Sequence, residues 1–282
     1  MNRSQRIDHQ AGLFHAADGM ALFEQTWQPR RVSGMVAVVH GIAEHSGRYA
    51  RLAEDLGAAG YAVTALDLRG HGRSEGLPAY VCSFDTYLDD LALFLERARG
   101  RCAGQPLFLL GHSMGGQIAA LYAIERQPEL AGLVLSGPSV RTGLTEPRAL
   151  WGLVRALNVV APRMPLLKLQ ATGLSHDETV VQGYVQDPLV YHGGLRVATL
   201  LAFRDASQRI QAGVERLSLP LLVLHGGSDP IVDPEGSREL VARAGTSDKT
   251  LHIYEGLLHE VLNESERERV VADLVAWLDA HR

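Results

Sequence analysis

The chain has 282 residues, of which 46% are hydrophobic and 21% charged, and its formal net charge is −5. This length suits one large α/β domain with room for an insertion, and it allows a sizeable buried core. Acidic and basic residues are interspersed and form no basic face, so nucleic acid is not expected as a partner.

The chain carries no pattern typical of export or membrane insertion. The first twenty residues contain no continuous apolar segment, and no run of eighteen apolar residues occurs. The cytoplasm is therefore the expected compartment. Cys82 and Cys102 lack C-x-x-C spacing, and no histidine pair has the H-x-x-x-H spacing of metal ligands, so we predict neither a metal nor a cofactor.

The N-terminal part of the chain predicts an antiparallel hairpin, because apolar runs flank the turn dipeptide Asp18-Gly19. Short apolar runs then recur and predict buried strands at 35–39, 61–66, 107–110, 133–135, 221–224 and 251–254. Helical patterns lie between them, for example at 84–98 and 270–278. This alternation predicts an α/β fold with a mostly parallel central sheet flanked by helices.

The alternation fails between residues 138 and 218, where about eighty residues separate two strand runs that a far shorter crossover could join. We interpret 138–218 as a helical cap inserted into a core formed by 1–137 and 219–282. Such a cap would lie above the carboxyl edge of the sheet, where active sites of open α/β folds occur. Its apolar stretch 150–160 fits two roles, transient contact with a lipid surface or packing against the core.

The most informative motif is Gly111-His112-Ser113-Met114-Gly115, which follows an apolar strand run and precedes a helical pattern. A G-x-S-x-G sequence between a strand and a helix is typical of a nucleophile elbow, in which the serine is held outward on a sharp turn. Glycines on either side allow strand and helix to approach closely. We therefore predict Ser113 as a catalytic nucleophile.

A serine hydroxyl needs a base and an acid that orients the base, and in elbow-type hydrolases both follow the serine in the chain. Of the later histidines, only His259 lies in a loop after a strand and before the final helix. The others precede the expected acid or lie within a strand or at the chain end; they are His176, His192, His225, His252 and His281.

Asp229 is the best candidate for the acid, because it follows a buried strand and lies in a glycine-containing loop. An aspartate there would hold the histidine tautomer and stabilise the imidazolium. Asp233 is the nearest competitor, but its position before Pro234 is typical of a solvated turn. The oxyanion needs two amide donors. We predict the backbone N–H groups of Met114, next to the nucleophile, and Ile42, after the first parallel strand.

Several motifs together resemble those of the monoacylglycerol lipases in the α/β-hydrolase superfamily. They run in order from about residue 35 to the end of the chain and include H-G-x-x-E-H-S-x-R-Y at 40–49, G-H-S-M-G-G at 111–116 and the segment 254–260. The resemblance implies an α/β-hydrolase fold with an inserted cap. It also implies the triad Ser113, Asp229 and His259 and the same two oxyanion amides.

The resemblance implies further that the protein cleaves monoacylglycerols to fatty acid and glycerol through an acyl-enzyme. The cap would hold an apolar channel, with Glu44, Arg48 and Tyr184 at a polar end that receives glycerol. Lysophospholipases share the 40–49 motif, and a broad carboxylesterase would use the same triad, so both alternatives stay open. A noncatalytic ligand-binding protein is disfavoured because all three triad residue types are present. The sequence predicts neither the acyl length nor the oligomeric state.

Overall fold

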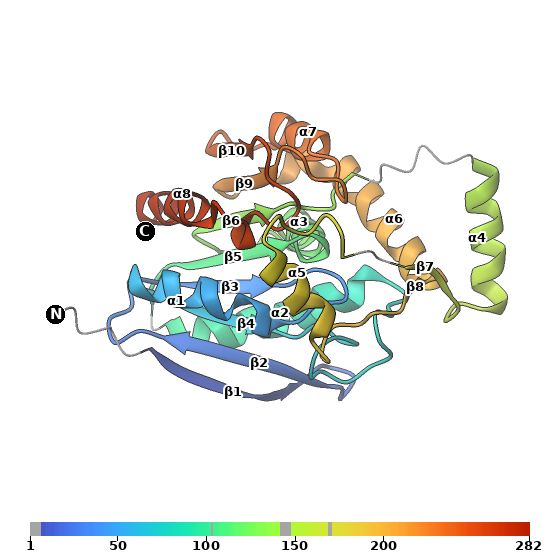
Figure 1. The fold of residues 1–282 in the computed structure, drawn as a ribbon, viewed down its shortest axis with the longest axis horizontal. Helices are drawn as coiled ribbons and strands as arrows, with labels where there is room; N and C mark the ends of the chain where they lie inside the picture. Colours follow the sequence, from blue (N-terminus) through green and yellow to red (C-terminus); the bar gives the residue numbers. More distant parts are fainter. Residues whose placement is uncertain (1–6, 103, 142–147, 169–170) are drawn as a thin grey trace.

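The structure is a computed structural model that describes residues 7–102, 104–141, 148–168 and 171–282. Its main feature is an eight-stranded sheet with the strand order β1-β2-β4-β3-β5-β6-β9-β10, around which the helices are arranged (Figure 1). The strands of this sheet are β1 (Asp8–His15), β2 (Ala21–Gln28), β3 (Gly34–Val39), β4 (Tyr61–Leu66), β5 (Leu107–His112), β6 (Gly132–Ser136), β9 (Leu221–Gly226) and β10 (Lys249–Tyr254).

Helices follow most of the strands, as the alternating sequence pattern predicts. The α-helices are α1 (Ala50–Ala58), α2 (Phe84–Cys102), α3 (Met114–Arg126), α4 (Arg148–Val160), α5 (Glu178–Gln186), α6 (Val197–Gly213), α7 (Glu235–Arg243) and α8 (Arg267–Ala280). Short 3-10 turns are η1 (Ser46–Tyr49), η2 (Val214–Arg216) and η3 (Val261–Asn263).

Strand pairing sets the edge at which functional loops can meet. β1 and β2 form the predicted antiparallel hairpin, and β2 also pairs antiparallel with β4. The pairs from β4 through β3, β5, β6 and β9 to β10 are all parallel. The carboxyl ends of β3, β5, β9 and β10 therefore lie along one edge of the sheet, where ligands of open α/β folds bind.

Side chains of the central strands alternate between two buried faces, because successive residues of a strand point to opposite sides. In β3, Met35 and Ala37 contribute to one core with α2, α3 and α6, whereas Val36 and Val38 contribute to the other core with α1 and α8. Both faces are thus covered by helices, as expected for a parallel sheet. The mostly parallel α/β fold is confirmed.

The predicted cap, residues 138–218, contains α4, α5 and α6 and a two-stranded antiparallel ribbon of β7 (Pro165–Lys168) and β8 (Gly194–Arg196). The ribbon was not part of the sequence prediction. α4 lies at one end of the molecule, far from the sheet (Figure 1). α6 instead packs into the main core through Ala202, Ala206 and Ile210. The exact cap boundaries at 138 and 218 stay a prediction.

Candidate active site

Ser113 sits on a sharp turn between β5 and α3, with φ 52° and ψ −114°. A φ in this region is costly for a residue with a side chain, and such strain is found mainly at functional sites. The flanking glycines are needed for close approach: a Cβ on Gly111 would lie 2.3 Å from the Gly115 carbonyl oxygen, and one on Gly115 would lie 2.1 Å from the Val39 oxygen. The local structure is that of a nucleophile elbow.

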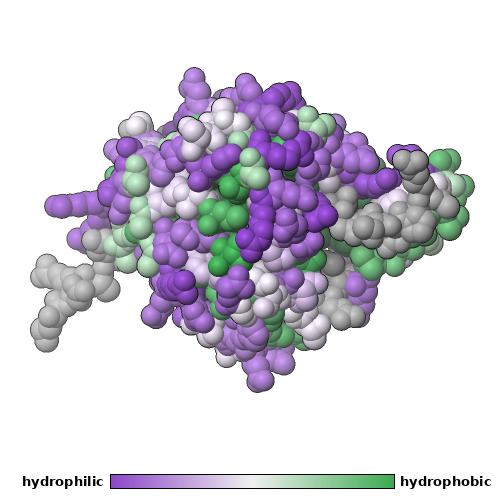
Figure 2. All heavy atoms as spheres, turned by 90° about the horizontal axis from the view of Figure 1, so that it is seen from above, coloured by the Kyte–Doolittle hydropathy of each residue, from purple (hydrophilic) through white to green (hydrophobic). Residues whose placement is uncertain are grey.

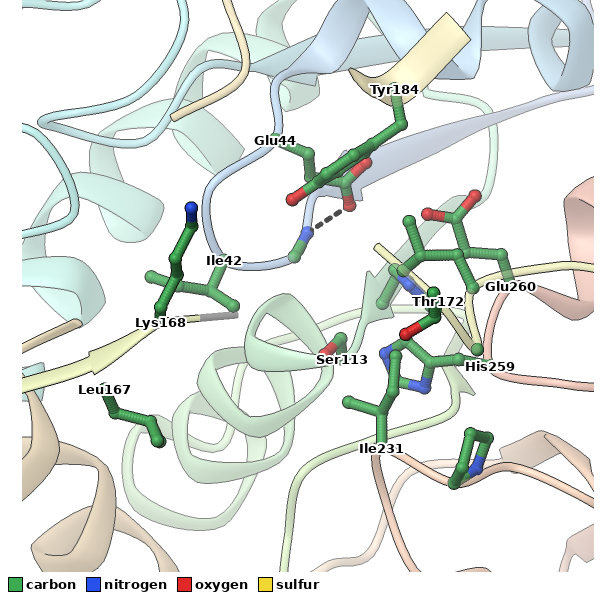
Figure 3. A pocket seen from close by; sticks show the side chains of 15 residues that line it. Ile42, Glu44, Ser113, Leu167, Lys168, Thr172, Tyr184, Ile231, His259 and Glu260 are labelled. Carbon is green, nitrogen blue, oxygen red and sulfur yellow. Dashed lines mark hydrogen bonds between the residues drawn. The ribbon is translucent and has the colours of Figure 1, made fainter. Parts of the chain in front are cut away.

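The structure brings the three predicted triad residues together. His259 Nδ1 lies 2.6 Å from Asp229 Oδ2, and both side chains are buried. The His259 imidazole lies beside Ser113 at the base of the cavity (Figure 3). Because Nδ1 donates to the carboxylate, Nε2 keeps the lone pair with which a base accepts a proton.

Asp229 is held in the ionised state that this arrangement needs. Its Oδ1 accepts hydrogen bonds from the backbone N–H groups of Ile231 (2.8 Å) and Val232 (3.0 Å). Burial by itself would raise the pKa of Asp229, but hydrogen bonds from His225 and His259 outweigh it and hold the pKa well below its usual value.

The competing candidates lie elsewhere. Asp233 is largely exposed and pairs with Arg141, and its Oδ1 accepts from the amide of Glu235 at the start of α7. His252 stacks on Tyr254 within β10. The remaining discounted histidines have other partners: His176 bonds Glu264, His192 contacts Tyr184, His225 bonds Ser237, and His281 stacks on Trp277.

One predicted oxyanion donor directly follows the nucleophile in the chain, and the other belongs to a residue that lines the same cavity. Ile42 follows β3 and lines the cavity, and Met114 is the first residue of α3. The first N–H groups of a helix have no partner inside the helix. In the part of the chain that the structure describes, neither amide donates to a protein acceptor. Both remain available for an oxyanion, and their role stays a prediction.

A buried cluster of charges occupies the polar end of the site. Arg48 Nη1 donates to Glu44 Oε2 (2.7 Å) and to Glu260 Oε1 (2.6 Å), and its Nη2 donates to Glu260 Oε2 (2.7 Å). Glu44 Oε1 also accepts from the Gly41 amide (2.6 Å; dashed line in Figure 3) and from the Tyr49 hydroxyl (2.9 Å). Two carboxylates share one guanidinium, so the cluster has a formal charge of −1.

Tyr184 of α5 closes this end from above (Figure 3). The Arg48 guanidinium lies 4.9 Å from the centre of its ring, a cation–π distance. Burial and the neighbouring Glu44 carboxylate raise the pKa of Tyr184 to about 12, so its hydroxyl stays protonated and can donate a hydrogen bond. Burial by itself would raise the pKa of Glu44, but Arg48, the neighbouring His112 and His40 and the Gly41 amide together outweigh it and lower the pKa.

A cavity of about 480 Å³ connects the predicted nucleophile to these groups. Its walls near Ser113 are apolar and come from both the strand-end loops and the cap. The apolar wall residues are Ile42, Leu167, Leu174, Pro230 and Ile231. Lys168 at the end of β7 is the cation on the cap side (Figure 3). Within the described ranges, no group of three or more histidine, cysteine or acidic side chains could hold a metal ion.

The loop that carries His259 is bonded to residues of the predicted cap. The His259 amide donates to the Gly173 carbonyl (3.3 Å) and the Glu260 amide to that of Leu174 (2.7 Å). The buried carboxylate of Glu264 accepts from the Leu258 amide and from the side chain of His176. These contacts fix the loop relative to residues 173–176.

Three buried side chains at the site were missed as functional candidates from sequence. Glu260 follows the predicted base directly and pairs with Arg48. His112 precedes the nucleophile, and its ring centre lies 4.8 Å from that of His259. Burial and the nearby His259 lower the pKa of His112 to about 4, so it is neutral at neutral pH. His225 was discounted as the base; it bonds Asp229 instead.

Comparison with known proteins places the chain among hydrolases. The family model described as serine aminopeptidase, S33, matches residues 30–266. The chain is 36% identical to a monoacylglycerol lipase of Mycolicibacterium smegmatis over the full length of both proteins. It is 37% identical to the human monoglyceride lipase, covering 88% of this chain and 82% of that protein.

Solved structures agree with this relationship. The crystal structure of a monoacylglycerol lipase from Paleococcus ferrophilus superposes with a TM-score of 0.81 at 30% sequence identity. The match covers 98% of this chain and all of that one. The similarity therefore extends over the sheet, the predicted site and the predicted cap together.

Proposed function

The chain belongs to the monoacylglycerol lipase family of the α/β-hydrolases, and from this premise we propose that it hydrolyses the ester bond of monoacylglycerols with Ser113, His259 and Asp229 as its catalytic triad. The observation that carries this proposal is the single cavity that joins Ser113 and His259 to an apolar wall and to the buried polar cluster around Glu44. An ester of one acyl chain with a small polar alcohol fits this cavity, because the acyl chain can lie along the apolar wall and the alcohol can lie at the polar cluster.

The reaction proceeds in two steps. Ser113 Oγ attacks the ester carbonyl while His259 Nε2 takes the hydroxyl proton, and the amides of Ile42 and Met114 donate to the oxyanion. The tetrahedral intermediate collapses, and glycerol leaves with the proton from His259. A water molecule deprotonated by His259 then attacks the acyl-enzyme, and fatty acid leaves as Ser113 regains its proton. Asp229 stabilises the imidazolium throughout.

The charge of the polar end favours a neutral leaving group. Arg48 donates three of its five N–H groups to Glu44 and Glu260, and the two carboxylates together outweigh its single positive charge. A phosphate brought against a cluster of formal charge −1 would meet like charge, which costs several kcal/mol when water is excluded. Glycerol hydroxyls can instead donate to carboxylate oxygens and accept from the Tyr184 hydroxyl. We therefore favour monoacylglycerol over lysophospholipid.

A substrate panel tests this proposal. Monoacylglycerols of increasing chain length should gain in kcat/KM about fourfold per methylene until the apolar wall is filled, because each buried methylene contributes about 0.8 kcal/mol. Monoacylglycerol should be preferred over the matched diacylglycerol and lysophosphatidylcholine, all measured below their aggregation thresholds. A flat chain-length profile would indicate a broad carboxylesterase. A preference for lysophosphatidylcholine would indicate a lysophospholipase.

We also propose that α4 makes transient contact with a lipid surface. One side of this helix packs on α6 through Trp151 and Val154, whereas Leu153, Val159 and Val160 are 66%, 83% and 78% exposed. Figure 2 shows apolar surface at the end of the molecule where α4 lies. Such an exposed apolar face marks an interaction site, and an amphipathic helix of this kind can lie in a membrane interface.

This contact would be peripheral. No helix in the described part of the chain is long and apolar enough to cross a membrane. Co-sedimentation with neutral phosphatidylcholine vesicles tests the proposal directly. Protein that stays entirely in the supernatant at high lipid concentration would contradict it.

A further inference from the structure

A second imidazole contacts the predicted catalytic acid. His225, the fifth residue of β9, is fully buried, and its Nε2 lies 3.1 Å from Asp229 Oδ2. The same oxygen receives the hydrogen bond from His259 Nδ1. One carboxylate oxygen thus lies between two imidazole rings, and the mechanism above uses only one of them.

The partners of His225 define its tautomer. Nε2 also lies 3.1 Å from the Val232 carbonyl oxygen, so it faces two acceptors and must carry the hydrogen. Nδ1 therefore holds the lone pair and accepts a hydrogen bond from the Ser237 hydroxyl at 2.7 Å. Ser237 belongs to α7 and is itself fully buried. With both nitrogens engaged, His225 has no lone pair free to accept the proton of Ser113.

We propose that His225, whose tautomer is held by the hydrogen bond from Ser237, is a positioning residue that orients Asp229 Oδ2 toward His259. The inference rests on the proposed triad. The backbone amides of Ile231 and Val232 hold Oδ1 of Asp229, whereas among the residues that the structure describes Oδ2 bonds His259 and His225 alone. Rotation about the Cβ–Cγ bond moves both oxygens, so without His225 the carboxyl group is restrained only by the two amides on Oδ1 and by the base itself, and the orientation of the base becomes less defined. Outer partners of this kind orient a functional ligand and tune its basicity.

The test compares three variants of the full chain. His225→Leu removes the donor and fills the site with an apolar side chain. His225→Gln keeps an N–H near the position of Nε2. Ser237→Ala removes the hydrogen bond to Nδ1 of His225. We expect kcat for a short-chain monoacylglycerol to fall about 10- to 100-fold in His225→Leu, the scale of lost outer partners. KM should stay unchanged, because His225 does not line the cavity. His225→Gln should recover most of kcat, and Ser237→Ala should show a smaller loss.

A matched control separates positioning from loss of stability. Thr199 is fully buried and donates to the Ala79 carbonyl, outside the cavity. Thr199→Val should lower the melting temperature and leave kcat unchanged. The low-field proton resonance of the His259–Asp229 hydrogen bond should shift in His225→Leu and stay in place in Thr199→Val.

The outcomes distinguish this inference from the proposed function. If a folded His225→Leu variant has the kcat of the wild type, the positioning role is wrong and the triad is unaffected. The same conclusion follows if the loss of kcat parallels the loss of melting temperature and His225→Gln does not restore kcat. If His225→Leu does not fold, the glutamine and Ser237→Ala variants carry the same comparison. An active Asp229→Asn enzyme would instead overturn the triad itself.

Discussion

The strand-end loops and helix α4 differ in the side chains that they present: the loops hold paired, buried charges, whereas α4 exposes apolar side chains. In the loops after β3, β5, β9 and β10, buried charges are paired and hydrogen-bonded, as at Arg48 and Asp229. In α4, by contrast, Leu153 and Val160 face solvent. Chemistry requires fixed orientation, whereas capture of a lipid requires accessible apolar surface. Substitutions in the loops should therefore lower the reaction rate or the stability, and substitutions on α4 should lower only the encounter with lipid.

The largest effect should come from the nucleophile. Ser113→Ala should reduce kcat by about 10⁶-fold, because a methyl group cannot form the acyl-enzyme. Labelling by a fluorophosphonate probe should disappear in the same variant. Circular dichroism checks that the fold is unchanged. Retained labelling would show that the nucleophile lies elsewhere.

Loss of the base should lower kcat about as much as loss of the nucleophile, and this comparison tests which histidine is the base. His259→Ala should lower kcat by a factor near that of Ser113→Ala, because residues that act as a unit show similar single losses. His252→Ala, in the adjacent strand, should keep most activity. Steady-state kinetics on one monoacylglycerol measure both variants. An inactive His252→Ala enzyme with an active His259→Ala enzyme would reverse the assignment of the base.

The acid should contribute less than the nucleophile. Asp229→Asn should preserve the fold and lower kcat by up to about 10⁴-fold, because the amide no longer holds the correct tautomer of His259. Asp233→Asn is the control, since within the described part of the chain that side chain bonds exposed Arg141 and an amide at the start of α7 and no residue of the predicted triad. A larger loss in Asp233→Asn would contradict the assignment.

Buried neutral histidines should make the core sensitive to acid. Burial and the nearby His40 lower the pKa of His71 to about 3, against about 6.5 in the unfolded chain. The unfolded state then binds the proton first, so stability falls as pH drops below about 6.5. By pH 5 this group alone costs about 2 kcal/mol.

His71→Asn tests that sensitivity. Asparagine keeps a donor for the Arg69 carbonyl, which His71 Nδ1 contacts at 3.0 Å, and removes the titrating ring. Urea unfolding at pH 7 and pH 5 should show a smaller loss of stability in the variant than in the wild type. Equal losses would mean that His71 does not contribute to the pH dependence.

The smallest effect should come from α4. Leu153→Ser should weaken binding to phosphatidylcholine vesicles about fivefold, corresponding to about 1 kcal/mol of apolar burial, and leave kcat on a water-soluble ester unchanged. Leu13→Ser is the matched control, because Leu13 is 58% exposed on β1, a sheet-edge strand outside the cap. Equal weakening in both variants would mean that α4 is not the lipid-binding surface.

Local sequence patterns predicted the strands and the nucleophile elbow. The features that they missed depend on contacts between residues far apart in the chain. The strands and the turn at Ser113 follow from neighbouring residues, so the elbow could be found from sequence. The apolar stretch at 150–160 of the predicted helical cap lies within α4. In contrast, the bond from His225 to Ser237 depends on how α7 packs against β9, and no spacing rule reveals it.

The cap shows the same limit. The strand β7 is short and exposed along its whole length, so it lacks the alternation that predicts strands. α6 carries a helical pattern like the rest of the insertion, and only its contacts reveal that it packs into the main core. The internal division of the predicted insertion therefore could not be read from the sequence.

The positive φ of Ser113 also bears on the energy of the whole fold. A backbone held in this region costs about 1–3 kcal/mol, a substantial share of the 5–15 kcal/mol by which a domain of ordinary stability resists unfolding. Glycine carries no such cost at this φ. The inactive Ser113→Gly protein should then have a higher melting temperature than the active enzyme. The position of the reactive hydroxyl is therefore maintained at the expense of thermal stability.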